Sequence, residues 1–392
     1  MSNTVLRIAS RGEGVLADGR HVPLTAPGDT IEDGGAITAG PHRQVPPCRH
    51  FPECGGCQLQ HVDDSAYAGF LVERITSALA AQAIVGSEIR EPHLSPPRTR
   101  RRASLHWGGA RGAIAIGFKA ARSHDIVDIR ECHVLRPELF ALVAPLRRLL
   151  RGRGKAGQIA MTLSDGGVDL GISGAAFEGL AGADALAAFA TEHRIARLSI
   201  DDGFGPQARW EPEPATVTLG GVAIPFPPGG FLQATADGEA ALVATVREAV
   251  GEAHIVADLF AGLGTFALAL EGRILAVEAA RDAALALKAA ANRVQRPIFV
   301  DHRDLFRRPL DEKELGRFEA VVLDPPRAGA REQTALLARS AVPRIAYVSC
   351  NPSTFARDAK TLIGGGYRLD WVKPVGQFCW STHVELAALF TR

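Results

Sequence analysis

Residues 254–266 read His-Ile-Val-Ala-Asp-Leu-Phe-Ala-Gly-Leu-Gly-Thr-Phe, an apolar run followed by a glycine-rich turn. The run predicts a buried strand, and the turn opens a segment of helical character. Gly262 and Gly264 allow the backbone to turn tightly and to approach a ligand closely. About twenty residues later a second apolar run ends at Glu278, where a carboxylate can accept hydrogen bonds from both hydroxyls of a ribose. Together they predict a nucleoside site.

The kind of nucleoside follows from what the turn lacks. It does not match the G-x-G-x-x-G pattern that binds a dinucleotide pyrophosphate. S-adenosylmethionine carries an adenosine but no phosphate, so the turn together with Glu278 suits this methyl donor. The alternative is a strand-to-helix turn with only a structural role.

The same alternation of strand and helix continues through residues 226–392. Segments rich in Ala and Leu separate runs that are almost wholly apolar, as in a sheet covered by helices on both faces. We therefore expect an α/β fold with a Rossmann-like domain over these residues. The predicted strands are 254–259, 273–277, 298–301, 320–323, 344–348 and 384–390.

Two further domains are predicted before this one. Residues 1–40 contain short alternating runs separated by glycines, which indicates a small β unit of the oligonucleotide-binding type. Residues 41–225 indicate a strand-rich middle domain. A helix at 63–82 has one apolar face and is a candidate for packing on the third domain instead. Further helices are predicted at 138–151 and 182–193.

The composition excludes a membrane-spanning protein of the helical type. No run approaches the roughly 18 apolar residues of a membrane helix, and the first residues lack a signal-peptide pattern. We expect a cytoplasmic monomer. The net charge is only +1, but basic residues form two clusters that either line a phosphate track or make a solvated face. The clusters are Arg98, Arg100, Arg101 and Arg102, and Arg147, Arg148, Arg151, Arg153 and Lys155.

Three motifs stand at the ends of predicted strands of the third domain. Asp324-Pro-Pro-Arg327 forms a stiff loop, and Cys350 stands between Ser349 and Asn351 at the end of the next strand. Ligands of open α/β sheets bind beyond the carboxyl ends of such strands. In the third motif, His383 and Glu385 alternate at strand period and are expected on one face. The alternatives are a proline-stopped strand, a structural cysteine and a solvated strand end.

These groups fit methylation of uracil at carbon 5. A thiolate that adds to carbon 6 creates an enolate, and carbon 5 of that enolate can attack the methyl group of a sulfonium. A base must then remove the proton from carbon 5 so that the thiolate can leave. Cys350, Glu385 and the glycine-rich turn supply the nucleophile, the base and the donor site.

The combination of Asp-Pro-Pro-Arg, Ser-Cys-Asn-Pro and His-Val-Glu closely resembles the RNA uracil-5 methyltransferases, which make 5-methyluridine in tRNA or large-subunit rRNA. The resemblance covers nearly the whole chain and implies that Cys350 is the nucleophile and Glu385 the proton acceptor. Thr265 departs from the Asn often found at its position, and Cys379-Trp380 stands where Pro-Gln is frequent. The residues implied to contact S-adenosylmethionine are Gln233, Phe260, Thr265, Glu278 and Asp324.

Four other cysteines predict a metal centre. Cys48, Cys54 and Cys57 are close together and Cys132 is isolated. Four thiolates can hold zinc or an iron–sulfur cluster, and the spacing leaves both open, with unrelated free thiols as a third reading. The resemblance to one branch of the family implies a [4Fe-4S] cluster with a structural role.

The partner implied by the resemblance is RNA, with large-subunit rRNA as the expected target and tRNA as the alternative. Residues 1–40 resemble a truncated TRAM domain, in which Arg7 and Arg11 are candidates for phosphate contacts. A cytosine-5 methyltransferase would need a cysteine where Pro326-Arg327 stand. A non-catalytic iron–sulfur RNA-binding protein is the alternative from another functional class, and it predicts no methyl transfer.

Overall fold

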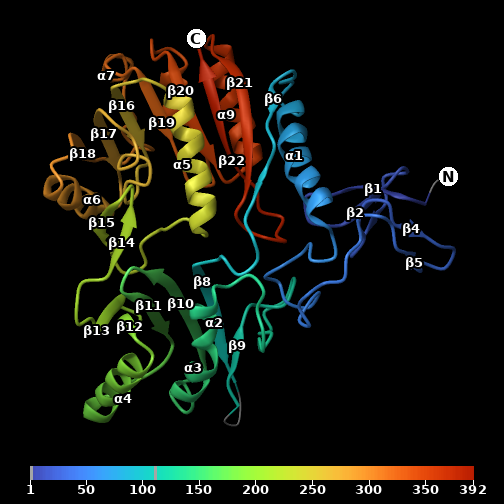
Figure 1. Ribbon diagram of the computed structural model, residues 1–392, viewed down its shortest axis with the longest axis vertical. Coiled ribbons are helices and arrows are strands. Elements are labelled where there is room, and N and C mark those ends of the chain that lie inside the picture. The colour runs from blue at the N-terminus through green and yellow to red at the C-terminus, as the bar shows by residue number, and fades with distance from the viewer. Residues whose placement is uncertain (1–2, 110–112) are drawn as a thin grey trace.

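A computed structural model describes residues 3–109 and 113–392 of the chain. Its largest element is a nine-stranded sheet with the strand order β18-β17-β16-β19-β20-β22-β21-β6, and β7 also pairs with β21 (Figure 1). The strands are β6 (Glu88–Ile89), β7 (His93–Leu94), β16 (Ile255–Leu259), β17 (Arg273–Glu278), β18 (Ile298–His302), β19 (Ala320–Leu323), β20 (Arg344–Ser349), β21 (Arg368–Gly376) and β22 (Glu385–Thr391).

Helices cover both faces of this sheet, because its strands are apolar on both sides. In β20, Ile345 and Tyr347 face one hydrophobic core, and Ala346 and Val348 face the other. The first core holds α1, α7, α8 and α9, and the second holds α5 and α6. The helices are α1 (Asp64–Ala80), α5 (Ala236–Val250), α6 (Arg281–Arg293), α7 (Glu312–Leu315), α8 (Arg331–Leu337) and α9 (Pro352–Gly364).

Two features of this sheet differ from the prediction. Strand β21 was not expected, and its register with β22 is antiparallel. Strand β22 begins only at Glu385, so His383 lies in the preceding loop and the two residues do not share a strand face. The strand order inserts β22 between β20 and β21, which the order of the motifs along the chain does not reveal.

Part of the predicted middle domain joins the large sheet. Helix α1 packs against α9 and β21, and β6 and β7 pair with β21. The hairpin of β14 (Thr216–Leu219) and β15 (Val222–Pro225) packs on α6. Residues 64–94 and 216–225 are therefore structurally part of the layered α/β unit, and the three-domain division itself stays a prediction.

The rest of the middle region is a six-stranded sheet with the order β13-β12-β11-β10-β8-β9, which lies below the large sheet in Figure 1. Helix α4 packs against β12 and β13, and α2 packs against β10. The elements are β8 (Arg102–Gly108), β9 (Ala115–Gly117), β10 (Ala156–Ser164), β11 (Gly167–Ser173), β12 (Ile195–Asp201), β13 (Pro206–Trp210), α2 (Pro137–Ala141), α3 (Val143–Leu149) and α4 (Gly179–Glu192).

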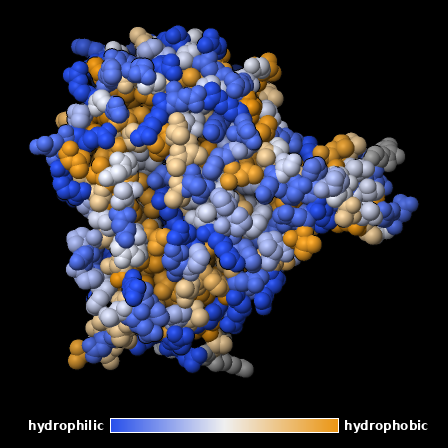
Figure 2. All heavy atoms as spheres, viewed as in Figure 1, coloured by the Kyte–Doolittle hydropathy of each residue, from blue (hydrophilic) through white to orange (hydrophobic). Residues whose placement is uncertain are grey.

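The N-terminal unit projects from one side of the molecule (Figures 1 and 2). It is held to α1 in part by an ion pair between Arg7 and Glu73, with 3.3 Å between nitrogen and oxygen. Its strands are β1 (Val5–Ile8), β2 (Gly14–Leu16), β3 (His21–Val22), β4 (Thr30–Ile31) and β5 (Ile37–Thr38). None of the described helices is long and apolar enough to cross a membrane.

The middle sheet contains a buried ion pair, and the removal of one partner tests how much the pair contributes to the stability of the protein. Arg197 of β12 donates to both carboxylate oxygens of Asp169 on β11, at 2.8 and 2.7 Å, and also to the carbonyl of Phe226. We predict that Arg197→Met lowers the free energy of unfolding by about 3–5 kcal/mol, because it leaves an unpaired buried carboxylate. Urea denaturation measures this change.

The matched control is Arg209→Met, which breaks an exposed pair with Asp202 in the same sheet. Its expected cost is at most about 1 kcal/mol. A double variant, Arg197→Met with Asp169→Leu, should recover much of the loss. Equal costs for Arg197→Met and Arg209→Met would contradict the prediction.

Candidate active site

The glycine-rich turn after β16 has a backbone that few side chains tolerate. Phe260, Gly262 and Gly264 have φ angles of 65°, 56° and 90°. A Cβ atom on Gly264 would lie 2.4 Å from a methyl carbon of Leu287, so glycine is required there for close packing on α6. The turn therefore holds its backbone in a fixed shape at the carboxyl end of the central strand.

Glu278, the last residue of β17, is tied to this turn. One carboxylate oxygen accepts the backbone N–H of Gly262 at 2.8 Å, and the other accepts that of Ala280 at 2.6 Å. Each oxygen keeps a lone pair for a ribose hydroxyl. Phe260 lies beside Phe306, with 5.5 Å between ring centroids. Sequence reasoning missed Phe306, because it stands in a loop without a motif.

Three carboxyl groups lie at the ends of β16, β19 and β22: Asp258 and Glu385 are buried, and Asp324 is half-buried. Burial, followed by the charge of nearby acids, raises the pKa of Asp258 and of Asp324 to about 7. Burial, followed by the charge of Asp324, raises the pKa of Glu385 to about 8. A carboxyl with such a pKa can take up a proton near neutral pH. This crowding of acids also favours a cationic ligand.

The strand register brings Cys350 and Glu385 together. The last pair of the β20–β22 ladder is Ser349 with Leu386, so the next step places Cys350 opposite Glu385. Directly opposite side chains on one face of an antiparallel pair lie about 5 Å apart at Cβ. Ala346 and Val348 face the core under α5, and alternation puts Cys350 on that same face.

The loop of Asp324 is fixed against the residues that follow Cys350. The side chains of Asn351 and Thr354 both donate to the carbonyl of Arg327, at 3.0 and 3.2 Å. Cys350 is half-buried. Burial raises the pKa of its thiol, Glu385 and Asp324 raise it further, and the charge of Arg327 opposes them. The two motifs therefore form one rigid unit around the thiol.

Gln233 is connected to Glu385 through a residue that sequence reasoning missed. Gln377 donates to the Oε1 atom of Gln233 at 2.8 Å and also to the carboxylate of Glu385. All three side chains are buried. The predicted donor site and the predicted base are thus joined by hydrogen bonds. Thr265, in contrast, is half-buried in the turn and is not part of this network.

Three arginines from separate parts of the chain lie close enough to His383 for their charges to act on it. Burial lowers the pKa of this histidine, and the charges of Arg327, Arg100 and Arg74 lower it further. Some members of the two predicted arginine clusters form ion pairs and are not free to contact phosphates. Arg101 pairs with Glu239 at 2.7 Å, and Arg147 pairs with Asp128 at 2.6 Å. Such residues fasten elements together rather than line a free track.

Comparison with known proteins agrees with this architecture. Residues 226–392 match the family model described as tRNA (Uracil-5-)-methyltransferase. An RNA methyltransferase of Zymomonas mobilis is 51% identical over 99% of both chains. The 23S rRNA (uracil(1939)-C(5))-methyltransferase of Pseudomonas putida is 34% identical over 90% of this chain and 81% of the relative.

The chain belongs to the RNA uracil-5 methyltransferase family of enzymes. A solved structure, the tRNA (uracil-54, C5)-methyltransferase of Pyrococcus abyssi in complex with S-adenosyl-L-homocysteine, shares its fold over the full length of both chains, with a TM-score of 0.75 and 22% identity. The predicted α/β class and the predicted enzyme class are confirmed.

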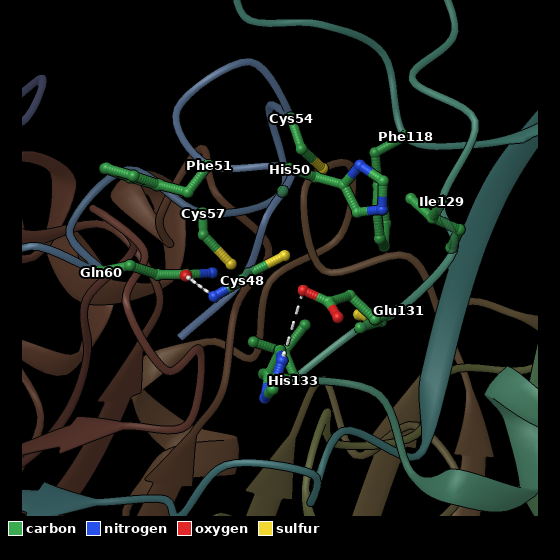
Figure 3. Close-up of a pocket in the computed structure, with 13 residues that line it drawn as sticks. Cys48, His50, Phe51, Cys54, Cys57, Gln60, Phe118, Ile129, Glu131 and His133 are labelled. Atoms are coloured by element: carbon green, nitrogen blue, oxygen red, sulfur yellow. Dashed lines mark hydrogen bonds and ion pairs between the residues drawn. The ribbon is translucent and has the colours of Figure 1, made fainter. Parts of the chain in front are cut away.

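In this uracil-5 methyltransferase the four remaining cysteines of the prediction line one cavity. Cys48, Cys54, Cys57 and Cys132 all border it, and Figure 3 shows the sulfur atoms of the first three directed inward. Burial raises the pKa of Cys57 to about 12. Within residues 3–109 and 113–392, no group of three or more His, Cys, Asp or Glu side chains is placed to hold a metal ion.

The cysteine-rich segment supports the loop between β21 and β22 of the methyltransferase sheet. The backbone N–H groups of Gln58 and Leu59 both donate to the carbonyl of Trp380 at 2.9 Å. The Tyr67 hydroxyl of α1 donates to the carbonyl of Phe378 at 3.0 Å. This loop ends at Glu385, so the cysteine-rich segment helps to set the position of the predicted base.

Proposed function

We propose that this enzyme methylates carbon 5 of a uridine in large-subunit rRNA, with S-adenosylmethionine as donor and Cys350 as covalent nucleophile. The observation that carries the proposal is the ladder register that sets Cys350 opposite Glu385. A nucleophile and a base on the same face of one sheet can act on adjacent atoms of one flat ring. The relative from Pseudomonas putida, named for 23S rRNA, supports the choice of target.

The proposed reaction uses the two side chains in turn. The thiolate of Cys350 adds to carbon 6 of the uracil, and carbon 5 then takes the methyl group from the sulfonium. Glu385 removes the proton from carbon 5, which restores the double bond and releases the thiolate. A pKa near 8 suits this carboxyl to exchange a proton at neutral pH.

The donor site combines shape with charge. Glu278 offers both carboxylate oxygens to a ribose, and Phe260 borders the same turn. The acids Asp258 and Asp324, with raised pKa values, favour a ligand that carries a sulfonium and an ammonium group. On the RNA side, the exposed Arg327, whose charge acts on His383, is suited to contact phosphates. A target uridine in folded RNA must be flipped out to reach Cys350.

We propose in addition that Cys48, Cys54, Cys57 and Cys132 hold a [4Fe-4S] cluster. Its support is the shared cavity and the chemistry of four thiols. Four thiolates can also hold a single zinc ion, and the resemblance to the iron–sulfur branch of the family favours the cluster. When bound, the cluster would tie segments of the chain together.

We predict that Cys350→Ala reduces methylation to background, because it removes the thiol that the ladder register places opposite Glu385. The test complements cells lacking this protein with either form and maps 5-methyluridine in rRNA and tRNA by mass spectrometry. The wild-type gene should restore one rRNA site. S-adenosylhomocysteine binding, measured by calorimetry, should persist in the variant, and Cys379→Ala is the matched control. Methylation by Cys350→Ala would refute the covalent mechanism, and a restored tRNA site would change the target.

Glu385→Gln should trap the covalent RNA adduct. The amide cannot take the proton from carbon 5, whereas loss of a negative charge beside Cys350 lowers the pKa of the thiol and does not slow its addition. Denaturing gels and intact-mass spectrometry detect the adduct. Glu332→Gln, an exposed change on α8, should leave no adduct. Release at the wild-type rate from Glu385→Gln would remove Glu385 from the role of base.

For the cluster, we expect anaerobically purified protein to contain about four irons and four acid-labile sulfides per chain. Cys57→Ala should lose most of both, since it removes the most buried of the four thiols. Cys379→Ala is the matched control, because Cys379 is half-buried and does not line the cavity. Zinc in place of iron would refute the proposal.

A further inference from the structure

The amide of Gln377 is held from three sides. Only 1% of this residue is exposed. Its Nε2 atom donates to Oε2 of Glu385 and to Oε1 of Gln233. Its Oε1 atom accepts the backbone N–H of Ala234 at 3.0 Å. Both N–H groups and the oxygen of the amide therefore have partners inside the protein.

These partners fix the direction of the amide. A reversed Gln377 would point its oxygen at the oxygens of Glu385 and Gln233 and its N–H groups at the N–H of Ala234, and every contact would be repulsive. Packing against α5 reinforces this orientation of the amide. A Cβ atom on Gly238 would lie 2.7 Å from Cβ of Gln377, so the helix leaves the side chain no room to move.

The strand register places Gln377 beside the reacting groups. Val375 pairs with Glu385 in the β21–β22 ladder, and Gln377 follows Val375 by two residues. Side chains two apart along a strand lie on the same face, and such diagonal neighbours are within reach of a long side chain. Glu385 is thus flanked by Cys350 on the β20 side and by Gln377 on the β21 side.

We propose that Gln377 is a positioning residue that dedicates one oxygen of Glu385 to proton transfer, and this inference rests on the proposed role of Glu385 as base. Gln377 occupies Oε2, and no other hydrogen bond to this carboxylate is found among the residues that the structure describes. Oε1 is the oxygen left to take the proton from carbon 5. The second N–H of Gln377 occupies Oε1 of Gln233, which fixes the amide of this predicted donor-site residue.

Gln377 serves the step that releases the adduct. The proton leaves carbon 5 for Oε1 of Glu385, and its electron pair forms the double bond between carbons 5 and 6. The bond between carbon 6 and sulfur breaks, and its pair returns to Cys350 as thiolate. Glu385 must be ionised at the start, and a hydrogen bond from Gln377 favours the ionised form.

The groups that face Glu385 have opposing effects on its pKa. Burial and the charge of Asp324, after β19, raise its pKa, and the hydrogen bond from Gln377, after β21, lowers it. Cys350, after β20, is the other titratable neighbour, and in the adduct its sulfur is bonded to carbon and carries no charge. Removal of Gln377 therefore leaves fewer Glu385 side chains ionised at neutral pH.

The test is the pH dependence of adduct release in Gln377→Met, which keeps the length of the side chain but lacks both donors. Hydrogen bonds to charged groups imply that the midpoint of release moves upward by about one to two pH units. At pH values below both midpoints, the variant releases the adduct about tenfold more slowly than the wild type for each pH unit by which its midpoint has moved. At high pH the two release rates converge. Rapid quench of a single-turnover reaction with uridine-containing RNA, between pH 6 and 10, gives these rates.

Gln333→Met is the matched control, because Gln333 is an equally buried glutamine whose side-chain hydrogen bonds, within the described residues, go to the backbone of Leu310. It should leave the midpoint unchanged. If Gln377→Met does not fold, Gly238→Ala displaces the same amide by contact and should move the midpoint in the same direction.

A uniform slowing at every pH with an unchanged midpoint would overturn the inference and leave Gln377 a purely structural residue. If Glu385→Gln still traps the adduct in that case, the proposed function stands without the inference. If Glu385→Gln releases normally, the proposed function itself fails.

Discussion

The site depends on the insertion of one antiparallel strand between two others. Strand β22 lies between β20 and β21, and its first residue, Glu385, meets a different neighbour on each side. Cys350 stands at the end of one neighbouring strand and Gln377 just beyond the other. Because the side-chain period of a strand is two, a slip of one residue in either ladder would turn one of these groups to the opposite face. Two hydrophobic cores, one on each face, hold the register.

Much of this arrangement could be predicted, because parallel strands with continuous apolar runs and a glycine-rich turn have strong local signals. The six predicted strands of the third domain are all present, with no end shifted by more than one residue. The α/β class follows from these strands. The roles of Cys350 and Glu385 came from motifs, and the register now gives them a shared face. Their roles in the reaction remain proposals.

Other features depend on contacts between distant segments, which local patterns do not encode. Strand β21 contains Lys373 and Pro374 and lacks a clean apolar run, and β6 is recognisable only through its pairing with β21. The network of Gln377 was missed because a lone glutamine has no motif. The arginine clusters looked like free surface, yet Arg101 and Arg147 are paired with acids that lie far away in the sequence. Whether such a side chain is free or held in a network depends on its burial and its partners rather than on its residue type.

The carbonyl of Trp380 has a consequence for how this enzyme can be divided. Residues 226–392 resemble a self-contained module, but the loop before Glu385 takes its hydrogen bonds from Gln58, Leu59 and Tyr67, more than 300 residues earlier. Helix α1 and strands β6 and β7 complete the same sheet. A fragment that begins at residue 226 would keep the nucleophile and lose the support of the base. Recombination of this module with a different RNA-binding region would have to carry residues 58–94 along with it.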